Sequence, residues 1–283
     1  MDGDKVKCLH PVYLAGGTIP VPCGKCINCC TNYSQEWSLR IIHEASLHEE
    51  NCFITLTYDD EKLGYPAVDL DKRHIQLFLK RLRKRIKVPI RFYQCGEYGG
   101  KTNRPHYHMI IFGWQPDDLV YLKTTKKGQE LYKSDFLADV WSYGFVGVGA
   151  LTMKTAPYCT KYMQKLDKRE HNVKPFSTMS LKPGIGFGVI TPYDLARKDY
   201  VIEGHHYPVP KAYINYLSRF PQYEQAVEIV KDRKAEQAGF KRSDYLDYND
   251  YIKRLAEESQ IMENLEKPRT FAEIRKIVEK NCI

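Results

Sequence analysis

Residues 104–112 read Arg104-Pro105-His106-Tyr107-His108-Met109-Ile110-Ile111-Phe112, and this stretch decides how the chain is interpreted. Its aromatic and β-branched side chains predict a β-strand. Because alternate side chains of a strand share one face of the sheet, His106 and His108 point toward a common ligand. Tyr107 points to the opposite face, where we expect it to pack rather than react.

A carboxylate is expected beside these two histidines. Glu97 lies on the strand predicted before them, across the turn-rich residues 99–104. A symmetric hairpin places it opposite or nearly opposite His106 on the same face. Two imidazoles and one carboxylate form a ligand set with open positions that suits Mn²⁺ or Mg²⁺ and can also hold Zn²⁺. The alternative is a pair of hydrogen-bonded histidines on a half-exposed sheet.

Strand and helix signals alternate around this hairpin. Strands are predicted at 53–58, 91–95, 106–112 and 145–151, and helices at about 32–48, 75–86, 134–141 and 158–167. Asp69 is a candidate cap for the second of these helices. The order predicts an α+β fold in which helices flank a central, largely antiparallel sheet. Residues 201–207 resemble a further hairpin, and residues 222–283 are charged and helix-prone.

Three regions differ in composition. Residues 1–50 form a Cys-rich arm followed by a helix, residues 51–170 hold the core with the histidine strand, and residues 171–283 form an extension that is mixed and then helical. We expect the second region to carry the chemistry. The sequence assigns no role to the third.

A Tyr-x-x-Lys pattern occurs twice in succession at residues 158–165. On a helix, spacings of three and four place Tyr158, Lys161, Tyr162 and Lys165 along one stripe. A neutral tyrosine is a poor nucleophile, and a neighbouring ammonium group and a metal-polarised target are two ways to make it effective. Attack on a phosphodiester would give a 5′-phosphotyrosine and a free 3′-hydroxyl. The alternative is an amphipathic helix with packed tyrosines and solvated lysines.

Composition excludes several classes of protein. The chain has 283 residues, of which 43% are hydrophobic, and this is enough to form a core. Disordered, collagen-like and acidic solvating proteins are therefore excluded. No stretch has the length and apolarity of a membrane span, and the N-terminus lacks the apolar region of a signal peptide. We expect a soluble intracellular protein without a membrane partner.

The positive charge of the chain is concentrated in one segment. The net charge is +8, and residues 72–91 carry nine Lys or Arg and no acidic residue, so the rest of the chain sums to −1. On the predicted helix these cations face away from the apolar stripe, which is typical of a surface that binds a DNA backbone through charge. The alternative is a solvated helix face. The candidate DNA-binding residues are Lys80, Arg81, Arg83, Lys84 and Arg85.

Five of the nine cysteines lie within the first 30 residues. An odd number in an intracellular protein favours reduced thiols or metal ligands over disulfides. Cys8, Cys23, Cys26 and Cys29 supply four thiolates, enough for a closed tetrahedral Zn²⁺ site. Reduced, partly buried thiols are an equal alternative, and an iron–sulfur cluster is a third, although the Cys-Pro of the bacterial ferredoxin pattern is missing. Cys30 is predicted to be a free thiol.

The order of these motifs resembles the HUH endonucleases, the replication initiators and relaxases of rolling-circle DNA replication. The closer resemblance is to the replication initiation proteins of gokushoviruses, small single-stranded DNA phages of the Microviridae. It covers roughly residues 8–190 and is carried by the segments 22–26, 43–47, 53–60, 95–99, 104–108 and 178–186.

The resemblance implies a fold and roles for individual residues. It implies an RRM-like palm, an endonuclease core at 51–170, a metal bound by His106 and His108 with Glu97 as third ligand, and nucleophilic attack by the helical tyrosines. Lys161 and Lys165 match the basic residues beside the nucleophile. The implied substrate is the single-stranded phage origin, nicked and later rejoined in the cytoplasm of a bacterial host together with host replication proteins. Tyr107 departs from the pattern, because the residue between the histidines is usually a bulky apolar one.

Other functions stay open at this point. A transposase or a plasmid relaxase would use the same chemistry. A non-catalytic nucleic-acid-binding module would keep the fold without cleavage, and a structural Zn²⁺ with an RNA-binding surface would need aromatic side chains exposed on the sheet.

Overall fold

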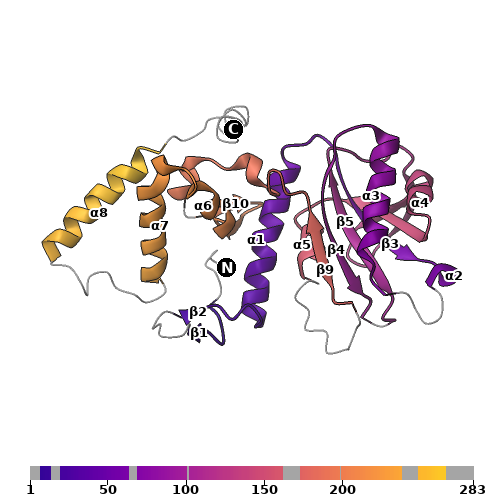
Figure 1. Cartoon of the computed structure of the whole chain (residues 1–283), viewed down its shortest axis with the longest axis horizontal. Coiled ribbons are helices and arrows are strands. Elements are labelled where there is room, and N and C mark those ends of the chain that lie inside the picture. Colours follow the sequence, from indigo (N-terminus) through magenta and orange to yellow (C-terminus); the bar gives the residue numbers. More distant parts are fainter. Residues whose placement is uncertain are drawn as a thin grey trace. The chain divides into compact units, whose positions relative to one another are not determined.

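The computed structural model describes residues 7–13, 20–63, 69–100, 102–161, 173–197, 199–237 and 248–265. The chain divides into two compact units, residues 6–186 and residues 187–283 together with 1–5. The larger unit holds the Cys-rich arm and the histidine strand, and Figure 1 shows its sheet with the helices around it. The three regions expected from the sequence, residues 1–50, 51–170 and 171–283, differ in the function predicted for each. That division stays a prediction.

The larger unit is built on a seven-stranded sheet whose strands all pair antiparallel. The order across the sheet is β6-β7-β8-β3-β5-β4-β9. The strands are β3 (Asn51–Tyr58), β4 (Arg91–Tyr98), β5 (Pro105–Phe112), β6 (Val120–Thr124), β7 (Glu130–Lys133), β8 (Gly144–Ala150) and β9 (Phe176–Met179). Its helices are α1 (Ile27–Ala45), α2 (Asp60–Leu63), α3 (Lys72–Ile86), α4 (Asp135–Trp141) and α5 (Ala156–Lys161). The predicted α+β class with a central antiparallel sheet is confirmed.

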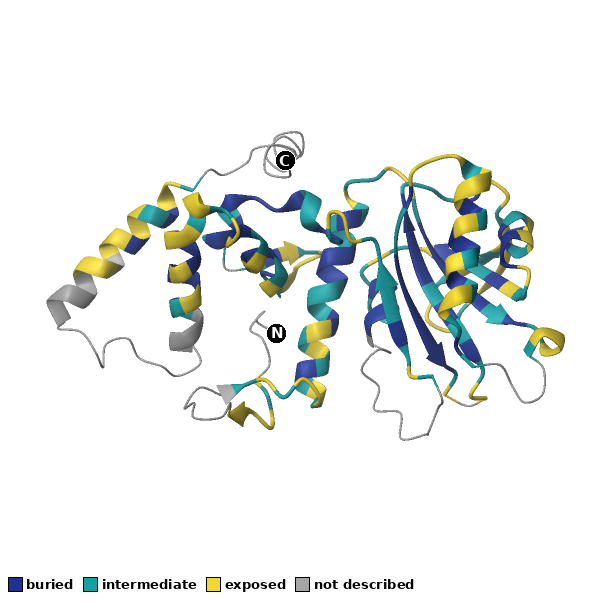
Figure 2. Cartoon of the chain, viewed as in Figure 1, coloured by how far each residue is buried: buried dark blue, intermediate teal, exposed yellow. Residues whose placement is uncertain are grey.

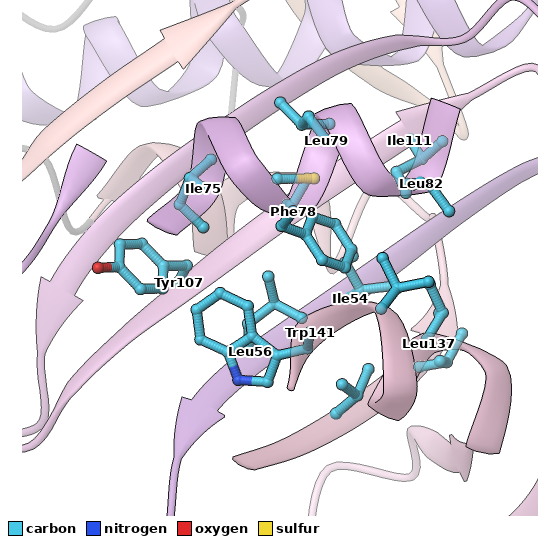
Figure 3. Close-up of a cluster of buried hydrophobic side chains, with 14 of the residues drawn as sticks. Ile54, Leu56, Ile75, Phe78, Leu79, Leu82, Tyr107, Ile111, Leu137 and Trp141 are labelled. Atoms are coloured by element: carbon cyan, nitrogen blue, oxygen red, sulfur yellow. The ribbon is translucent and has the colours of Figure 1, made fainter. Parts of the chain in front are cut away.

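One face of the sheet packs against α3 and α4. Ile75, Phe78 and Leu82 of α3 are buried against alternate residues of β3 and β5, and Trp141 of α4 closes the cluster. Figure 3 shows these side chains meeting between the helices and the strands. Tyr107 lies in this cluster with no exposed surface, so its predicted packing role is confirmed.

The residues of α3 divide cleanly between core and solvent. Its apolar side chains are buried while most of its cations are exposed, and Figure 2 shows this alternation along the helix. The cap differs from the prediction. The Asp71 carboxylate accepts a hydrogen bond from the Arg73 amide at 2.7 Å, whereas Asp69 accepts one from the Tyr98 hydroxyl at 3.1 Å. The helix therefore begins two residues further along than an Asp69 cap would place it.

The opposite face of the sheet is covered in part by α1 and α5. Ile41 of α1 and Cys159 of α5 are buried with residues of β3, β4 and β5, including Phe53 and Ile110. A buried hydrogen bond of 2.8 Å joins the hydroxyls of Ser34 and Thr160, so the two helices also hold each other. We call this side of the sheet the α5 face.

The start of α1 differs from the predicted residue 32. The helix begins at Ile27, because the Cys26 thiol accepts a hydrogen bond from the Cys29 amide and serves as its N-cap. Cysteine is not among the usual capping residues, so the sequence signal for this end was absent. A small hairpin of β1 (Val12–Tyr13) and β2 (Pro20–Val21) precedes the helix.

The smaller unit contains a hairpin and helices. The hairpin pairs β10 (Asp199–Ile202) with β11 (His205–Pro208), as the sequence predicts, and it is followed by α6 (Lys211–Leu217), α7 (Glu224–Gln237) and α8 (Tyr248–Glu263). Tyr213, Leu217 and Val227 are among its buried residues. Across the described parts of the chain, no helix combines the length and the apolarity needed to span a membrane.

Candidate metal and nucleophile site

Glu97, His106 and His108 meet on the α5 face of the sheet. The register of β4 and β5 places Glu97 directly across from His106, as the hairpin argument predicted. The Glu97 Oε1 atom lies 2.8 Å from His106 Nε2 and 3.2 Å from His108 Nε2. Ligand atoms of all three residues lie within 4.8 Å of one another, which is the spacing of a metal-binding group. We call these three residues the triad.

The outer nitrogen of each imidazole has its own partner. His106 Nδ1 lies 3.2 Å from the Arg104 carbonyl oxygen, and His108 Nδ1 lies 3.0 Å from the Thr55 hydroxyl. A carbonyl oxygen only accepts hydrogen bonds, so this contact favours the tautomer of His106 that has its proton on Nδ1. These contacts fix the ring orientations and aim both Nε2 atoms inward, as the outer partners of metal-binding histidines do.

A cation between His106 and Glu97 would satisfy both side chains in one tautomer of the histidine. With its proton on Nδ1, a neutral His106 ring presents a lone pair at Nε2, and the carboxylate oxygen 2.8 Å away also carries only lone pairs. A metal ion can bind to both of these acceptor atoms. The second oxygen of Glu97, Oε2, is buried and has no hydrogen-bond partner among the described residues. An unpaired buried carboxylate oxygen is costly, and a cation would satisfy it.

The pKa of Glu97 reflects this setting. Burial by itself raises the pKa of the carboxyl group, but hydrogen bonds and charge interactions with His106 and His108 outweigh burial, and the net pKa is lowered. The carboxylate is therefore ionised near neutral pH and available as a ligand. The donor set of two imidazoles and one ionised carboxylate fits a divalent metal ion.

The helix that carries Tyr158 covers the face on which the triad lies. Cys159 and Ala156 of α5 pack beside Cys95, which is the strand neighbour of Glu97 on the same face. Tyr158 is half-buried at the border of this cluster. The helix is described as far as Lys161, without that lysine's side chain, and the predicted residues Tyr162 and Lys165 lie outside the described residues.

Tyr158 has a cationic partner that the sequence did not reveal. The Lys127 ammonium group, in the turn between β6 and β7, donates a hydrogen bond of 2.7 Å to the Tyr158 hydroxyl and lies 5.2 Å from the ring centre. The two residues are 31 positions apart, so no helical spacing could have paired them. Among the described side chains, this lysine places an ammonium group at the candidate nucleophile.

Comparisons with known proteins identify the family of the chain. A sequence model of the ORF2 type of replication-associated protein matches residues 51–167, which include the triad and α5. The chain is 32% identical over 269 residues to the Replication-associated protein VP4 of Bdellovibrio phage phiMH2K, covering 87% of this chain and 83% of the other. The chain belongs to the microvirid family of replication-associated proteins. The resemblance seen in the sequence motifs is thereby confirmed.

Two further relatives extend this family assignment. The Replication-associated protein ORF2 of Spiroplasma virus 4 is 30% identical over 275 residues, 88% of this chain and 84% of the other. The Replication-associated protein ORF4 of Chlamydia phage 1 is 37% identical over 156 residues, 52% of this chain and 39% of the other. No solved structure matches the chain.

The replication-associated protein has a second group of metal-ligand type near its N-terminus. The sulfur atoms of Cys8, Cys23, Cys26 and Cys29 lie within 4.8 Å of one another. Two of the sulfur pairs are 3.9 and 4.0 Å apart, and a tetrahedral zinc ion with Zn–S bonds of about 2.3 Å requires sulfurs about 3.8 Å apart. We call these residues the cysteine cluster.

Backbone amides support the cysteine cluster. The Cys23 amide donates to the Cys8 sulfur at 3.3 Å, and the Cys26 amide donates to the Cys23 sulfur at 3.3 Å. A hydrogen bond from the backbone of Cys29 is the main cause that lowers the pKa of the Cys26 thiol to about 6, while burial raises that of Cys29 to about 12. Cys30 lies outside the cluster, and its thiol contacts the Lys25 carbonyl.

The predicted DNA-binding helix of the replication-associated protein lies on the other face of the sheet from the triad. Arg81 donates hydrogen bonds to the Trp141 carbonyl and the Ser142 hydroxyl, both at 3.1 Å, and Arg85 forms an ion pair with Asp139. The guanidinium group of Arg83 lies 5.5 Å from the ring centre of Phe92. Lys80 and Lys84 are exposed. The five residues thus form a basic surface behind the face that carries the triad, partly tied to the protein itself.

Proposed function

We propose that this replication-associated protein is a metal-dependent tyrosine endonuclease and strand transferase that nicks single-stranded phage DNA at the origin and later rejoins the ends. The observation that carries the proposal is the triad. The ligand atoms of Glu97, His106 and His108 lie close together, a carboxylate oxygen of Glu97 has no hydrogen-bond partner among the described residues, and this arrangement supports a cation site on the face that α5 covers. The family assignment supplies the DNA context.

The reaction is a transesterification at phosphorus. The Tyr158 oxygen attacks the scissile phosphate and forms a new P–O bond, while the bond to the 3′ oxygen breaks. The tyrosine gives up its proton to solvent, and the departing oxygen takes up a proton from solvent to become the 3′-hydroxyl. Glu97, His106 and His108 would hold a divalent cation, Mn²⁺ or Mg²⁺ in this proposal, which would supply charge stabilisation at the phosphate. Tyr162 would serve a second round of strand transfer, with Lys161 and Lys165 beside the two tyrosines.

A covalent-adduct assay tests the proposal. The full chain is incubated with labelled single-stranded origin DNA and Mn²⁺ or Mg²⁺, and the products are separated under denaturing conditions. We expect a labelled band at the mass of the protein plus DNA that is absent when EDTA is present. If the cognate origin gives no adduct with either metal, the protein is not a tyrosine endonuclease. A non-catalytic nucleic-acid-binding module would instead bind the strand and leave it intact.

Lys127 is proposed to stabilise the Tyr158 phenolate as its proton leaves. We expect Lys127→Ala to slow adduct formation by about 10- to 100-fold at neutral pH, because the ammonium group donates directly to the attacking oxygen. The difference in rate between Lys127→Ala and wild type should shrink as pH rises, since hydroxide then removes the tyrosine proton more readily. Lys127→Arg should restore most of the rate. Single-turnover rates across a pH series measure this.

The neighbouring exposed lysine provides a matched control for Lys127. Lys126→Ala removes the same charge from the same turn and should leave the rate within about twofold of wild type. Equal losses in both variants, or a loss at Lys127 that is the same at every pH, would show a general charge effect and no role at the tyrosine oxygen.

We further propose that the cysteine cluster holds a structural Zn²⁺ ion. The sulfur spacing and the amide hydrogen bonds support a closed tetrahedral site of four thiolates. The site includes the cap of α1, and α1 packs on α5 through Ser34 and Thr160. A metal at the cluster would therefore stabilise the support of the helix that carries Tyr158.

Metal analysis tests the zinc proposal. We expect about one zinc ion per chain in the wild type and close to none in Cys23→Ser, since a structural zinc site needs all four ligands. Cys30→Ser is the matched control and should keep its zinc, because Cys30 lies outside the cluster. Loss of zinc should also lower the thermal unfolding temperature. Unchanged zinc content in Cys23→Ser would remove the proposal.

The remaining proposals concern the surroundings of the enzyme. We propose that it acts in the cytoplasm of the bacterial host, together with host replication proteins. The basic face of α3 is proposed to bind the DNA backbone away from the cleavage site, through the exposed Lys80 and Lys84 first, with Arg81, Arg83 and Arg85 around them. A transposase or plasmid relaxase would share the nicking chemistry, and the match to phage proteins over most of the chain favours replication.

A further inference from the structure

One large aromatic side chain stands in solvent on the α5 face of the sheet. Phe145 of β8 is 67% exposed, although it lies in a paired strand of the seven-stranded sheet. It makes no ring contact with any described residue. An exposed aromatic ring on a sheet surface is available to stack on a nucleic-acid base.

The register of the sheet places Phe145 next to the triad. Phe145 pairs with Thr57 of β3, Thr57 pairs with His106 of β5, and His106 pairs with Glu97 of β4. These four residues therefore form one row across the α5 face. Neighbouring strands lie about 4.8 Å apart, so the Phe145 backbone is about 10 Å from that of His106. A strand of DNA whose phosphate lies at the triad passes beside this ring.

Glycines lie near Phe145 along β8. At Gly144, where β8 begins, a Cβ atom would lie 2.2 Å from the Asp59 amide nitrogen, so only glycine allows β8 to pair this closely with β3. Gly147, two residues beyond Phe145 on the same face, has no atom of the described residues within 4 Å of the place where its Cβ would be. No described side chain covers the sheet at that point, so a sugar and phosphate can approach the backbone.

Cations line the same face farther from the triad. Tyr132 of β7 pairs with Val148, which belongs to the buried α3 side, so the next residue, Lys133, projects to the α5 face. Lys123 of β6 pairs with Leu131 and projects to that face as well. Both lysines are exposed. A surface that binds single-stranded DNA combines an aromatic ring for stacking with cations that bind the backbone. The α5 face has both, with an accessible stretch of backbone between them.

We infer that Phe145 stacks on a base of the single-stranded DNA beside the scissile phosphate, and that Lys133 and Lys123 bind the backbone of the same strand. This inference rests on the proposed function for the position of the strand. It adds a binding surface on β6, β7 and β8, on the same face as the triad, in contrast to the basic helix α3 on the other face. Stacking on an aromatic ring reads no particular base, so this surface holds the strand without selecting the origin sequence.

The test is a binding measurement without cleavage. Fluorescence anisotropy of labelled (dT)20 with the full chain and no added Mn²⁺ or Mg²⁺ gives the Kd without cleavage. We expect Phe145→Ala to raise the Kd by about 5- to 150-fold, and Phe145→Trp to stay within about twofold of wild type. Tyr121→Ala, at an exposed aromatic residue whose strand partner Tyr132 packs on the α3 side, is the matched control and should not change the Kd.

A strand without bases separates stacking from other causes. On an abasic strand of the same length, wild type and Phe145→Ala should bind equally, while Lys133→Ala should weaken binding to both strands. The inference fails if Phe145→Ala binds (dT)20 like wild type, if it loses the same factor on the abasic strand, or if Phe145→Trp loses as much as Phe145→Ala. The adduct assay decides the proposed function separately, because binding of (dT)20 without added Mn²⁺ or Mg²⁺ requires no cleavage.

Discussion

A Tyr158→Phe variant is expected to lose the covalent protein–DNA adduct almost completely, by roughly three orders of magnitude or more in rate. The substitution removes one oxygen atom, the proposed nucleophile, and keeps the ring that packs at the border of the buried cluster beneath α5. The hydroxyl accepts a hydrogen bond from the exposed Lys127 ammonium, which water can replace. The fold should therefore be unaffected. Denaturing gels of single-turnover reactions with labelled origin DNA measure the loss.

The second tyrosine makes the Tyr158 experiment more discriminating. Tyr162→Phe should leave the first adduct intact and impair the later transfer step, and the double variant should be inactive in both. An adduct that persists in Tyr158→Phe and disappears in Tyr162→Phe would reverse the order that we propose. An adduct that persists in the double variant would exclude both residues. Far-ultraviolet circular dichroism and thermal unfolding of each variant exclude misfolding as the cause of a loss.

Period-two alternation was enough to predict the centre of the site. His106, His108 and Glu97 lie on one face with Glu97 across from His106, and Tyr107 lies in the core on the other side, as the sequence pattern predicted. The alternation works here because each face of a central strand meets a different environment. Helical spacing of three and four residues likewise predicted the buried stripe of α3 at Ile75, Phe78, Leu79 and Leu82.

Features that depend on contacts between distant residues were not predictable. The strands β6 and β7 were missed because β6 is exposed on all its residues and has no buried face to impose a pattern. Their turn carries Lys127, so the cation beside Tyr158 was missed with them. The sequence also could not tell which face of the sheet α3 would cover, because an apolar stripe packs equally well on either. The basic surface consequently lies behind the site rather than beside it.

A Glu97→Gln variant is expected to lose metal binding and cleavage together. The amide has nearly the shape of the carboxylate, but it carries no charge and its nitrogen cannot bind a cation. Outer partners of metal ligands typically contribute 10- to 100-fold to affinity, so a direct charged ligand should contribute about 100-fold or more. Cleavage should fall by about 10²- to 10³-fold at a fixed Mn²⁺ concentration. Electron paramagnetic resonance of Mn²⁺ measures the affinity without DNA.

Glu44→Gln provides the matched control for a buried carboxylate in the same unit. Glu44 is 2% exposed and bonds with Arg91, His48 and the Gly186 amide. Burial raises the pKa of its carboxyl group, but these partners outweigh burial and the net pKa is lowered. Its replacement should lower the thermal unfolding temperature and leave Mn²⁺ affinity unchanged. If Glu97→Gln instead behaves like Glu44→Gln, with lower stability and full Mn²⁺ affinity, the triad is a hydrogen-bonded structural group and the cation at His106 is a proton.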